Sequence, residues 1–393
     1  MKKRLTPILL ALLLAVLFST PAFAKTVCKI GSKGYNSLQA AINAVKDGET
    51  IKVTKAISTN EMVTCSPSAQ NGKYPSYTID FKNKKYKYTG YEYAFRIRWG
   101  SVKFKNINFI LQRGFLYTNN YGPSDNKLII DSGKYTGGAL ARIDDQFADW
   151  GDNILVINNG TFNIKDSTTA TILNNSVVTI NGGKFNNCRL DNYGTCNLNN
   201  GKWSERVGLG AGGVVVWNYK DGNITVSGGT YTGNNTFYNE GNLTFTGGTM
   251  NSAGSISGGK ITVKGGTFNK VTLNGVQSNP VVMSINGTIT GGTFNGAIHC
   301  PGGSKATIDG GKCNGYIFAE GGDITINKMT VNTKSTDGDN PVCLIAKGGS
   351  IKVNNGSFTC TDGYGYRQEN GGKVTFGVSN PASLFKVKTL ELK

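Results

Sequence analysis

The chain has 393 residues, with 42 Lys and Arg against 24 Asp and Glu, which gives a formal net charge of +18. Glycine is abundant at 54 residues, proline is scarce at 9, and 38% of the residues are hydrophobic, a composition that excludes a disordered low-complexity chain. The single histidine, His299, excludes every zinc site that needs two histidines.

The N-terminal residues 1–24 are predicted to be a signal peptide. Three basic residues at 2–4 precede an apolar run at 8–18, and an A-x-A cleavage motif ends at Ala24. The apolar run is shorter than the ~20 residues that span a bilayer. We therefore expect an exported bacterial protein, secreted or held at the cell surface, with no membrane span.

Residues 25–60 are predicted to contain a capping helix followed by a first strand. The apolar residues Leu38, Ala41, Ile42 and Val45 follow helical spacing, and Ser37 is suited to cap the helix N-terminus.

A short repeat dominates residues 61–393. An alternating apolar strand is followed by Gly-Gly or Asn-Gly, then Thr or Lys, then a large side chain, as in the copies ending at Phe162, Phe185, Trp203 and Tyr231. The shortest spacing between these landmarks is 18 residues, too short for a propeller blade of about 40–45 residues. Three short strands joined by tight glycine turns fit this length. The repeat predicts an all-β, parallel β-solenoid of about 12–14 coils.

Asparagines provide a second repeating landmark. Asn174, Asn192 and Asn239 each lie six residues before a landmark apolar residue, and Asn218 and Asn120 match once insertions are allowed. Stacked coils would place these side chains in a ladder of amides hydrogen-bonded along the rod. The large landmark residues should form a matching apolar stack.

The repeats and the segment 37–51 resemble the right-handed parallel β-helix proteins of the pectate-lyase-like superfamily. The resemblance covers roughly residues 35–385 and implies that the helix covers the open end of a single-stranded right-handed solenoid. Its motifs specify a fold and not an activity, since this scaffold hosts lyases, hydrolases, phage spikes and adhesins.

A carboxylate-rich stretch is the first candidate site. Asp144, Asp145, Asp149 and Asp152 lie within nine residues and could chelate Ca²⁺, which prefers six to eight oxygen ligands. The alternative is a solvated loop whose aspartates cap turns.

Three arginines extend this candidate site. Alternation along the predicted strands places Arg96, Arg98 and Arg142 on an outward face with Asp144. By resemblance, polyuronate lyases combine carboxylate-bound Ca²⁺ with an Arg or Lys base, which requires a strongly perturbed Arg pKa.

Candidate sugar-stacking residues are Trp99, Tyr121 and Trp150. The aromatic residues of the N-terminal coils could equally pack over those coils. The lone His299 is expected to be a stacked or surface residue and not a base.

All eight cysteines lie in the exported part, where they either form disulfides or act as small buried hydrophobes. Cys343 and Cys360 are 17 residues apart, close to one short coil, so a disulfide between them is a hypothesis.

The sequence thus predicts a monomeric, exported β-helix protein that binds carbohydrate or a surface partner without catalysis, as an adhesin-like or glycan-binding protein. The alternative is a Ca²⁺-dependent polysaccharide lyase acting on an acidic glycan such as a polyuronate. The net charge favours an anionic polysaccharide or cell-surface glycan as partner, or serves solubility and the protection of strand edges. The lysines are dispersed, and Lys82, Lys84, Lys85 and Lys87 form the only dense run, which argues against nucleic acid.

Overall fold

The computed structural model describes most of the chain. The described residues are 26–112, 115–118, 125–144, 151–165, 170–205, 213–252, 256, 258–271, 280–334 and 341–392. The predicted signal peptide lies outside them, and within them no helix has the length and apolar character needed to cross a bilayer.

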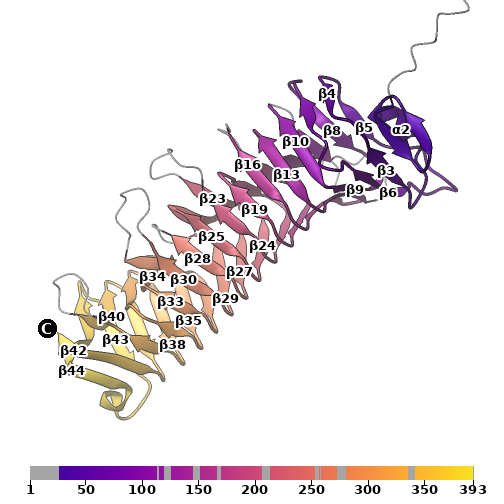
Figure 1. The fold of residues 1–393 in the computed structure, drawn as a ribbon. Coiled ribbons are helices and arrows are strands. Elements are labelled where there is room, and N and C mark those ends of the chain that lie inside the picture. The colour runs from indigo at the N-terminus through magenta and orange to yellow at the C-terminus, as the bar shows by residue number, and fades with distance from the viewer. Residues whose placement is uncertain are drawn as a thin grey trace, which may run out of the picture.

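The chain winds into a rod in which most of the described coils contribute one strand to each of three faces (Figure 1). Strands of successive coils pair in parallel, as in β12 (Asn126–Ile130) with β15 (Asn153–Ile157). The predicted all-β parallel β-helix is therefore confirmed. The first face alone contains 15 parallel strands in the described residues, slightly more than the 12–14 coils expected, which at ~4.8 Å per coil gives a rod of about 67 Å.

The first sheet begins with an antiparallel hairpin and continues as a parallel ladder. Its strands are β1 (Cys28–Ile30), β2 (Lys33–Tyr35), β3 (Thr50–Val53), β6 (Ser76–Asp80), β9 (Gly100–Lys105), β12, β15, β18 (Val177–Ile180), β21 (Thr195–Leu198), β24 (Asn223–Val226), β27 (Asn242–Phe245), β29 (Lys260–Val263), β32 (Gly287–Ile289), β35 (Lys305–Ile308), β38 (Asp323–Ile326), β41 (Ser350–Val353) and β43 (Lys373–Phe376).

The second sheet follows each glycine turn and carries the large landmark side chains. Its strands are β4 (Ile57–Thr59), β7 (Tyr86–Tyr88), β10 (Ile107–Leu111), β13 (Gly133–Gly137), β16 (Thr161–Ile164), β19 (Lys184–Asn186), β22 (Lys202–Ser204), β25 (Thr230–Gly233), β28 (Thr249–Ser252), β30 (Thr267–Lys270), β33 (Thr293–Asn295), β36 (Lys312–Cys313), β39 (Thr330–Asn332), β42 (Ser357–Glu369) and β44 (Phe385–Leu392).

The third sheet has eight strands in the N-terminal two thirds of the rod. They are β5 (Val63–Cys65), β8 (Tyr93–Ile97), β11 (Phe115–Thr118), β14 (Ala141–Ile143), β17 (Ile172–Asn174), β20 (Leu190–Asn192), β23 (Val214–Asn218) and β26 (Asn235–Asn239). The same face continues as β31 (Val281–Ser284), β34 (Ala297–Pro301), β37 (Ile317–Glu320) and β40 (Val342–Lys347). It merges with the second sheet at β42, which pairs with β39 of the second sheet and with β40 of the third face.

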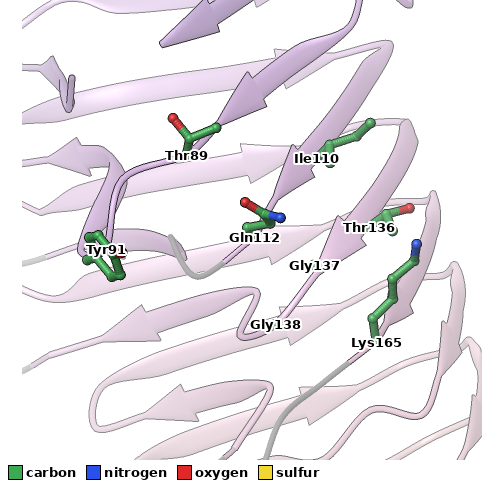
Figure 2. A pocket seen from close by; sticks show the side chains of 8 residues that line it. All are labelled: Thr89, Tyr91, Ile110, Gln112, Thr136, Gly137, Gly138 and Lys165. Carbon is green, nitrogen blue, oxygen red and sulfur yellow. The ribbon is translucent and has the colours of Figure 1, made fainter. Parts of the chain in front are cut away.

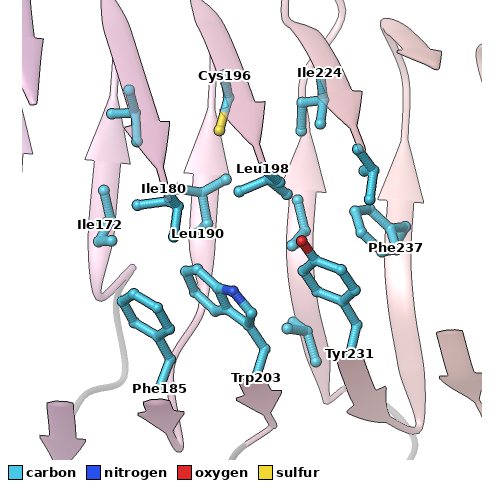
Figure 3. Close-up of a cluster of buried hydrophobic side chains, with 14 of the residues drawn as sticks. Ile172, Ile180, Phe185, Leu190, Cys196, Leu198, Trp203, Ile224, Tyr231 and Phe237 are labelled. Carbon is cyan, nitrogen blue, oxygen red and sulfur yellow. The ribbon is translucent and has the colours of Figure 1, made fainter. Parts of the chain in front are cut away.

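The large landmark side chains form the predicted interior column. Phe162, Phe185, Trp203 and Tyr231 are register partners in consecutive coils, and all are at most 1% exposed. The ring centroids of Phe162 and Phe185 are 4.8 Å apart, and those of Phe185 and Trp203 are 3.9 Å apart. Part of this column is visible between the sheets in Figure 3. One continuous apolar core therefore runs through the solenoid.

The asparagine ladder is also confirmed. The Asn174 side chain donates to Asn192 (2.6 Å), Asn192 donates to Asn218 (2.8 Å), and Asn218 donates to Asn239 (2.7 Å). All four are at most 1% exposed, so their amides are satisfied only inside the protein. Asn120 lies outside the described residues.

The N-terminal end of the core is covered by α2 (Leu38–Ala44). Ser37 caps the helix by accepting from the Ala40 backbone N–H at 3.1 Å, and Leu38, Ala41 and Ile42 are buried. The predicted capping helix is therefore present. At the other end, a 3₁₀ helix η2 (Pro381–Leu384) leads into β44, which pairs in parallel with β42.

The predicted disulfide between Cys343 and Cys360 is wrong, because all eight cysteines are buried free thiols. The register explains why. Val342 and Leu344 of β40 pair with Tyr364 and Tyr366 of β42, so Cys343 lies opposite the residue between these tyrosines and not opposite Cys360. The cysteines are therefore the small buried hydrophobes of the alternative interpretation.

Candidate functional site

A continuous column of polar and aromatic residues runs along the outer face of the third sheet. Its members alternate with inward residues and are register partners in successive coils: Arg96, Tyr117, Arg142, Leu173, Asp191, Trp217 and Tyr238. Six coil spacings make this surface about 29 Å long, enough for several units of an extended polymer.

An aromatic cluster occupies the N-terminal end of the column. The Tyr93 and Tyr117 rings stack with centroids 4.2 Å apart, and Phe115 packs edge-on against Tyr93 at 5.0 Å. The Arg96 guanidinium lies over the Tyr117 ring at 5.8 Å. Tyr117 is only 4% exposed, so the half-buried rings of Tyr93 and Phe115 form the accessible part of this cluster, with Arg96 beside it.

The next coil contributes an arginine and an aspartate from one strand end. Arg142 Nε lies 3.3 Å from Asp144 Oδ2, which also accepts from the Tyr117 hydroxyl at 3.0 Å. Asp144 Oδ1 accepts from the Asn175 amide at 2.9 Å. Asp144 is thus buried and hydrogen-bonded on both oxygens, while nearly half of the Arg142 side chain is exposed.

A second aromatic cluster occupies the C-terminal end. Tyr193 and Tyr219 stack with centroids 4.0 Å apart, Trp217 stacks on Tyr219 at 5.3 Å, and Tyr238 lies 4.8 Å from Trp217. Tyr193 and Tyr238 are 41% and 40% exposed, which is rare for large aromatic rings among the described residues of this protein. These rings form a second platform open to solvent.

Another arginine–aspartate pair lies beside this platform. Arg189 Nε and Nη2 donate to the two oxygens of Asp191 at 2.7 and 2.8 Å, and the guanidinium lies 5.9 Å from the Trp217 ring. Burial raises the pKa of Asp191, and the Arg189 guanidinium opposes that shift. The two N–H···O bonds make this a bidentate ion pair, which fixes the orientation of the guanidinium relative to the carboxylate.

A hollow of about 420 Å³ lies between the two aromatic clusters. Its lining includes Phe115, Ala139, Leu173 and the two arginines, together with Asp191. The column is therefore a groove with an aromatic platform at each end and an arginine–aspartate pair on either side of its centre.

A separate hollow of about 510 Å³ lies at the corner between the second and third sheets. Thr89, Tyr91, Gln112, Thr136 and Lys165 line it, and Figure 2 shows their side chains along the ends of adjacent strands. Tyr91 is 77% exposed. This hollow has one aromatic ring and one cation, so it lacks the paired platforms of the groove.

The structure places the predicted arginines and tryptophan near the N-terminal platform. Arg96 and Arg142 share the outer column, on either side of Tyr117 in the register, as predicted. Arg98 lies over Trp99 at 6.0 Å, and Trp99 stacks on Tyr74 at 5.3 Å, at the end of β8. Trp99 therefore packs against the N-terminal coils, which was the alternative interpretation.

The predicted calcium loop is only partly described. Asp145, Asp149 and Trp150, like Tyr121, lie outside the described residues, in which no group of three or more metal-ligating side chains occurs. The loop ends meet, since the Asn153 side chain donates to the Asp144 backbone carbonyl. Binding Ca²⁺ through Asp144 would require its carboxylate to exchange the hydrogen bonds described above. The calcium site stays a prediction.

The dense lysine run lies at the corner between the first and second sheets. Lys82, Lys84, Lys85 and Lys87 are exposed there, and the neighbouring turn adds Lys105. Lys82 pairs with Asp80 at 3.2 Å. This corner therefore gathers several exposed lysines on the described surface, away from the outer face of the third sheet.

His299 stacks on Phe318 with centroids 5.1 Å apart, as expected of a stacked residue. Its Nδ1 lies 3.2 Å from the Ser284 hydroxyl, and its Nε2 lies 3.5 Å from Glu320, beyond a good hydrogen bond. Burial lowers the His299 pKa, and Glu320 opposes the shift.

Sequence reasoning missed the C-terminal platform. A signal was present, because each ladder asparagine is flanked by outward residues in Asp191-Asn192-Tyr193, in Trp217-Asn218-Tyr219 and in Tyr238-Asn239. Once the asparagines are placed inward, strand alternation turns their neighbours outward on adjacent coils.

No protein-family model, no curated protein and no solved structure matches the chain.

Proposed function

We propose that this protein binds a glycan chain along the outer groove of the third sheet, without catalysing its cleavage. The observation that carries the proposal is the pair of aromatic platforms on one continuous face, joined by a hollow with polar side chains. Aromatic rings suit the apolar faces of sugars, and tyrosine and arginine are among the residues that dominate binding surfaces. The extended groove fits a polymer better than a compact ligand.

The repeats and the capping helix support membership of the pectate-lyase-like superfamily, and the signal-peptide pattern supports export to the cell surface or medium. Superfamily membership and export are therefore both part of the proposal. The net charge of +18 and the lysine corner support attraction to anionic groups at the lysine corner, which lies between the first and second sheets and not in the groove. A surface protein that meets extracellular polysaccharide would use both the groove and the lysine corner.

The lyase alternative has one observation in its favour. Arg96 and Arg142 lie on the same outer column beside Asp144, the combination expected of a polyuronate lyase. Asp144, however, is buried and already accepts three contacts from Tyr117, Arg142 and Asn175. The glycan-binding proposal needs no rearrangement of these contacts.

Binding to insoluble plant and bacterial cell-wall polysaccharides in a pull-down tests the proposal. We expect Tyr193→Ala combined with Tyr238→Ala to weaken binding at least about tenfold, because both rings are exposed on the C-terminal platform. Tyr91→Ala is the matched control, since it removes an exposed ring from the other hollow. Circular dichroism and thermal melting would confirm that the variants fold.

Equal binding by the platform variant and the parent protein would refute the proposal, and so would loss of binding only in the Tyr91→Ala control. The lyase alternative is tested in parallel, by incubating the protein with polyuronates and Ca²⁺. An EDTA-sensitive rise in the ultraviolet absorbance of unsaturated uronate would replace the binding-only function.

A further inference from the structure

The hollow at the centre of the groove is formed by two small residues in adjacent coils. Backbone hydrogen bonds between neighbouring segments place Ala139 and Ala170 in the two coils between Phe115 and Arg189. Larger side chains at both ends and alanines between them leave a depression about three coil spacings, or about 14 Å, long. Its volume of about 420 Å³ lies within the range of small-ligand sites.

The lining of the hollow combines apolar and polar side chains. Phe115, Leu173 and the alanines supply apolar surface, while Arg142, Arg189 and Asp191 supply polar groups. A guanidinium carries five N–H donors, of which the Arg189 pair with Asp191 uses two. Donors therefore remain for a ligand on a side chain whose orientation is already fixed.

The charges around the hollow are balanced. Each arginine is paired with the aspartate two residues further along its own chain segment, Arg142 with Asp144 and Arg189 with Asp191. Both aspartates are only 5% exposed, so their charges are held close beneath the surface. The hollow thus differs from the lysine corner, where positive charge prevails.

We propose that the hollow binds a neutral, hydroxyl-rich sugar unit of the glycan and not a uronate or sulfated unit. The inference rests on the proposed function, because it names the class of ligand for the same groove. Hydroxyl groups donate to the aspartate oxygens and accept from the guanidinium, so one neutral ring uses both members of a pair. Its apolar face packs on Phe115 and Leu173.

An acidic sugar is disfavoured at this position. Its carboxylate would approach Arg189 only beside the buried carboxylate of Asp191, and like charges repel strongly when water is excluded. It would otherwise have to break the bidentate pair and leave Asp191 buried without its partner, which is costly. Asp191, the aspartate that lines the hollow, therefore acts as a filter against anions.

The test measures binding of neutral and acidic oligosaccharides by isothermal titration calorimetry. The probes are xylohexaose, mannohexaose and cellohexaose as the neutral panel, and hexamers of galacturonate and guluronate as the acidic panel. We expect at least one neutral probe to bind with an affinity that changes less than about twofold between about 0.05 and 0.5 M NaCl. We expect both acidic hexamers to bind the groove at least about tenfold more weakly.

Two variants connect this binding to the hollow. Ala139→Trp should fill the depression and weaken neutral binding at least about tenfold, since it removes the space without removing a ligand-binding group. Thr244→Trp is the matched control, because it adds the same side chain on the outer face of the first sheet. Asp191→Asn, which keeps the shape but removes the charge, should weaken neutral binding and raise the relative affinity for the acidic hexamers.

The outcomes separate the two proposals. Preferential binding of an acidic hexamer that weakens with salt and is lost in Ala139→Trp would overturn the neutral-sugar inference and leave glycan binding by the groove intact. Neutral binding that Ala139→Trp leaves unchanged would also overturn the inference. Binding of neither panel, together with platform variants that have no effect on polysaccharide pull-down, would overturn the proposed function itself.

Discussion

The buried asparagine ladder gives the sharpest test of what holds the coils together. Asn192 accepts from Asn174 at 2.6 Å and donates to both Asn218 and the Gly194 carbonyl at 2.8 Å. Asn192→Ala removes all three hydrogen bonds at a position that is 0% exposed, where water cannot replace them. The Gly194 carbonyl still accepts from the Asn223 backbone N–H, so one Asn174 N–H and the Asn218 side-chain oxygen lose their partner. An unmet buried polar group costs about 1–3 kcal/mol, so two of them predict a loss of about 2–6 kcal/mol.

An exposed ladder provides the matched control. Asn181 donates to Asn158 at 3.0 Å and accepts from Asn199 at 2.9 Å, so it too bridges two neighbouring coils. Both of these contacts are exposed, and water can take the place of the lost amide. Asn181→Ala should therefore cost about 1 kcal/mol or less.

The measurement must be local, because a solenoid can open coil by coil and need not unfold in one step. Hydrogen exchange followed by mass spectrometry reports the opening free energy of peptides covering β17, β20 and β23. Urea unfolding followed by circular dichroism gives the global change. Equal losses for Asn192→Ala and Asn181→Ala, or a loss of less than about 1 kcal/mol for the buried variant, would refute the reasoning.

Three further predictions follow from buried groups and tight turns. Burial raises the pKa of Cys65 and of Cys313 to about 12, so iodoacetamide should label no thiol of the native protein at neutral pH. After unfolding without reductant it should label all eight cysteines, and a smaller number of labelled cysteines would reveal a disulfide. Burial also raises the pKa of Glu205, so ionisation of this side chain destabilises the fold as the pH rises through the raised pKa. Melting temperatures measured over a pH series should show this loss of stability in the parent protein and not in Glu205→Gln. The same pH dependence in both proteins would contradict the prediction. Gly133 has φ +121°, and a Cβ there would lie 2.2 Å from the Ile107 backbone oxygen in the preceding coil. Gly133→Ala should therefore cost well over the ~1 kcal/mol expected for Gly303→Ala, whose φ is +76° in open space; equal urea midpoints would contradict this.

The core could be predicted from the sequence because it repeats. Phe162, Phe185 and Trp203 each follow a glycine turn in a fixed unit, so a one-dimensional pattern determines which residues meet in three dimensions. Asn218 could be assigned to the ladder once its inserted residues were allowed for, and its buried amide bonds to Asn192 and Asn239 as that assignment requires.

The groove could be predicted only in part because outward residues do not repeat. Arg96 and Arg142 were placed on one face by strand alternation alone, which the register bears out. Trp217 is matched by Asp191 in the preceding coil and by Tyr238 in the next, so its position has no fixed residue type and the repeat gives it no weight. Its partners Tyr219 and Arg189 become neighbours only through the hydrogen-bond register.

Asp144 illustrates how grouping along the chain can differ from grouping in space. In sequence it belongs to a run of four aspartates that suggests a cation site. In the fold, its carboxylate is directed to Tyr117 and Asn175, which lie 27 and 31 residues away along the chain. Contacts across coils, and not within the loop, therefore determine the chemistry of this carboxylate.

The ladder inside the wall and the platforms outside it are two consequences of one register. Asn192 and Asn218 are held one coil apart by their amide hydrogen bond, and the next residues, Tyr193 and Tyr219, are thereby brought to a centroid distance of 4.0 Å. This distance is close to the ~4.8 Å spacing of paired strands. A solenoid can thus build a flat binding surface from strands alone, and the buried amides that fix the coil spacing also position the rings that would meet the glycan.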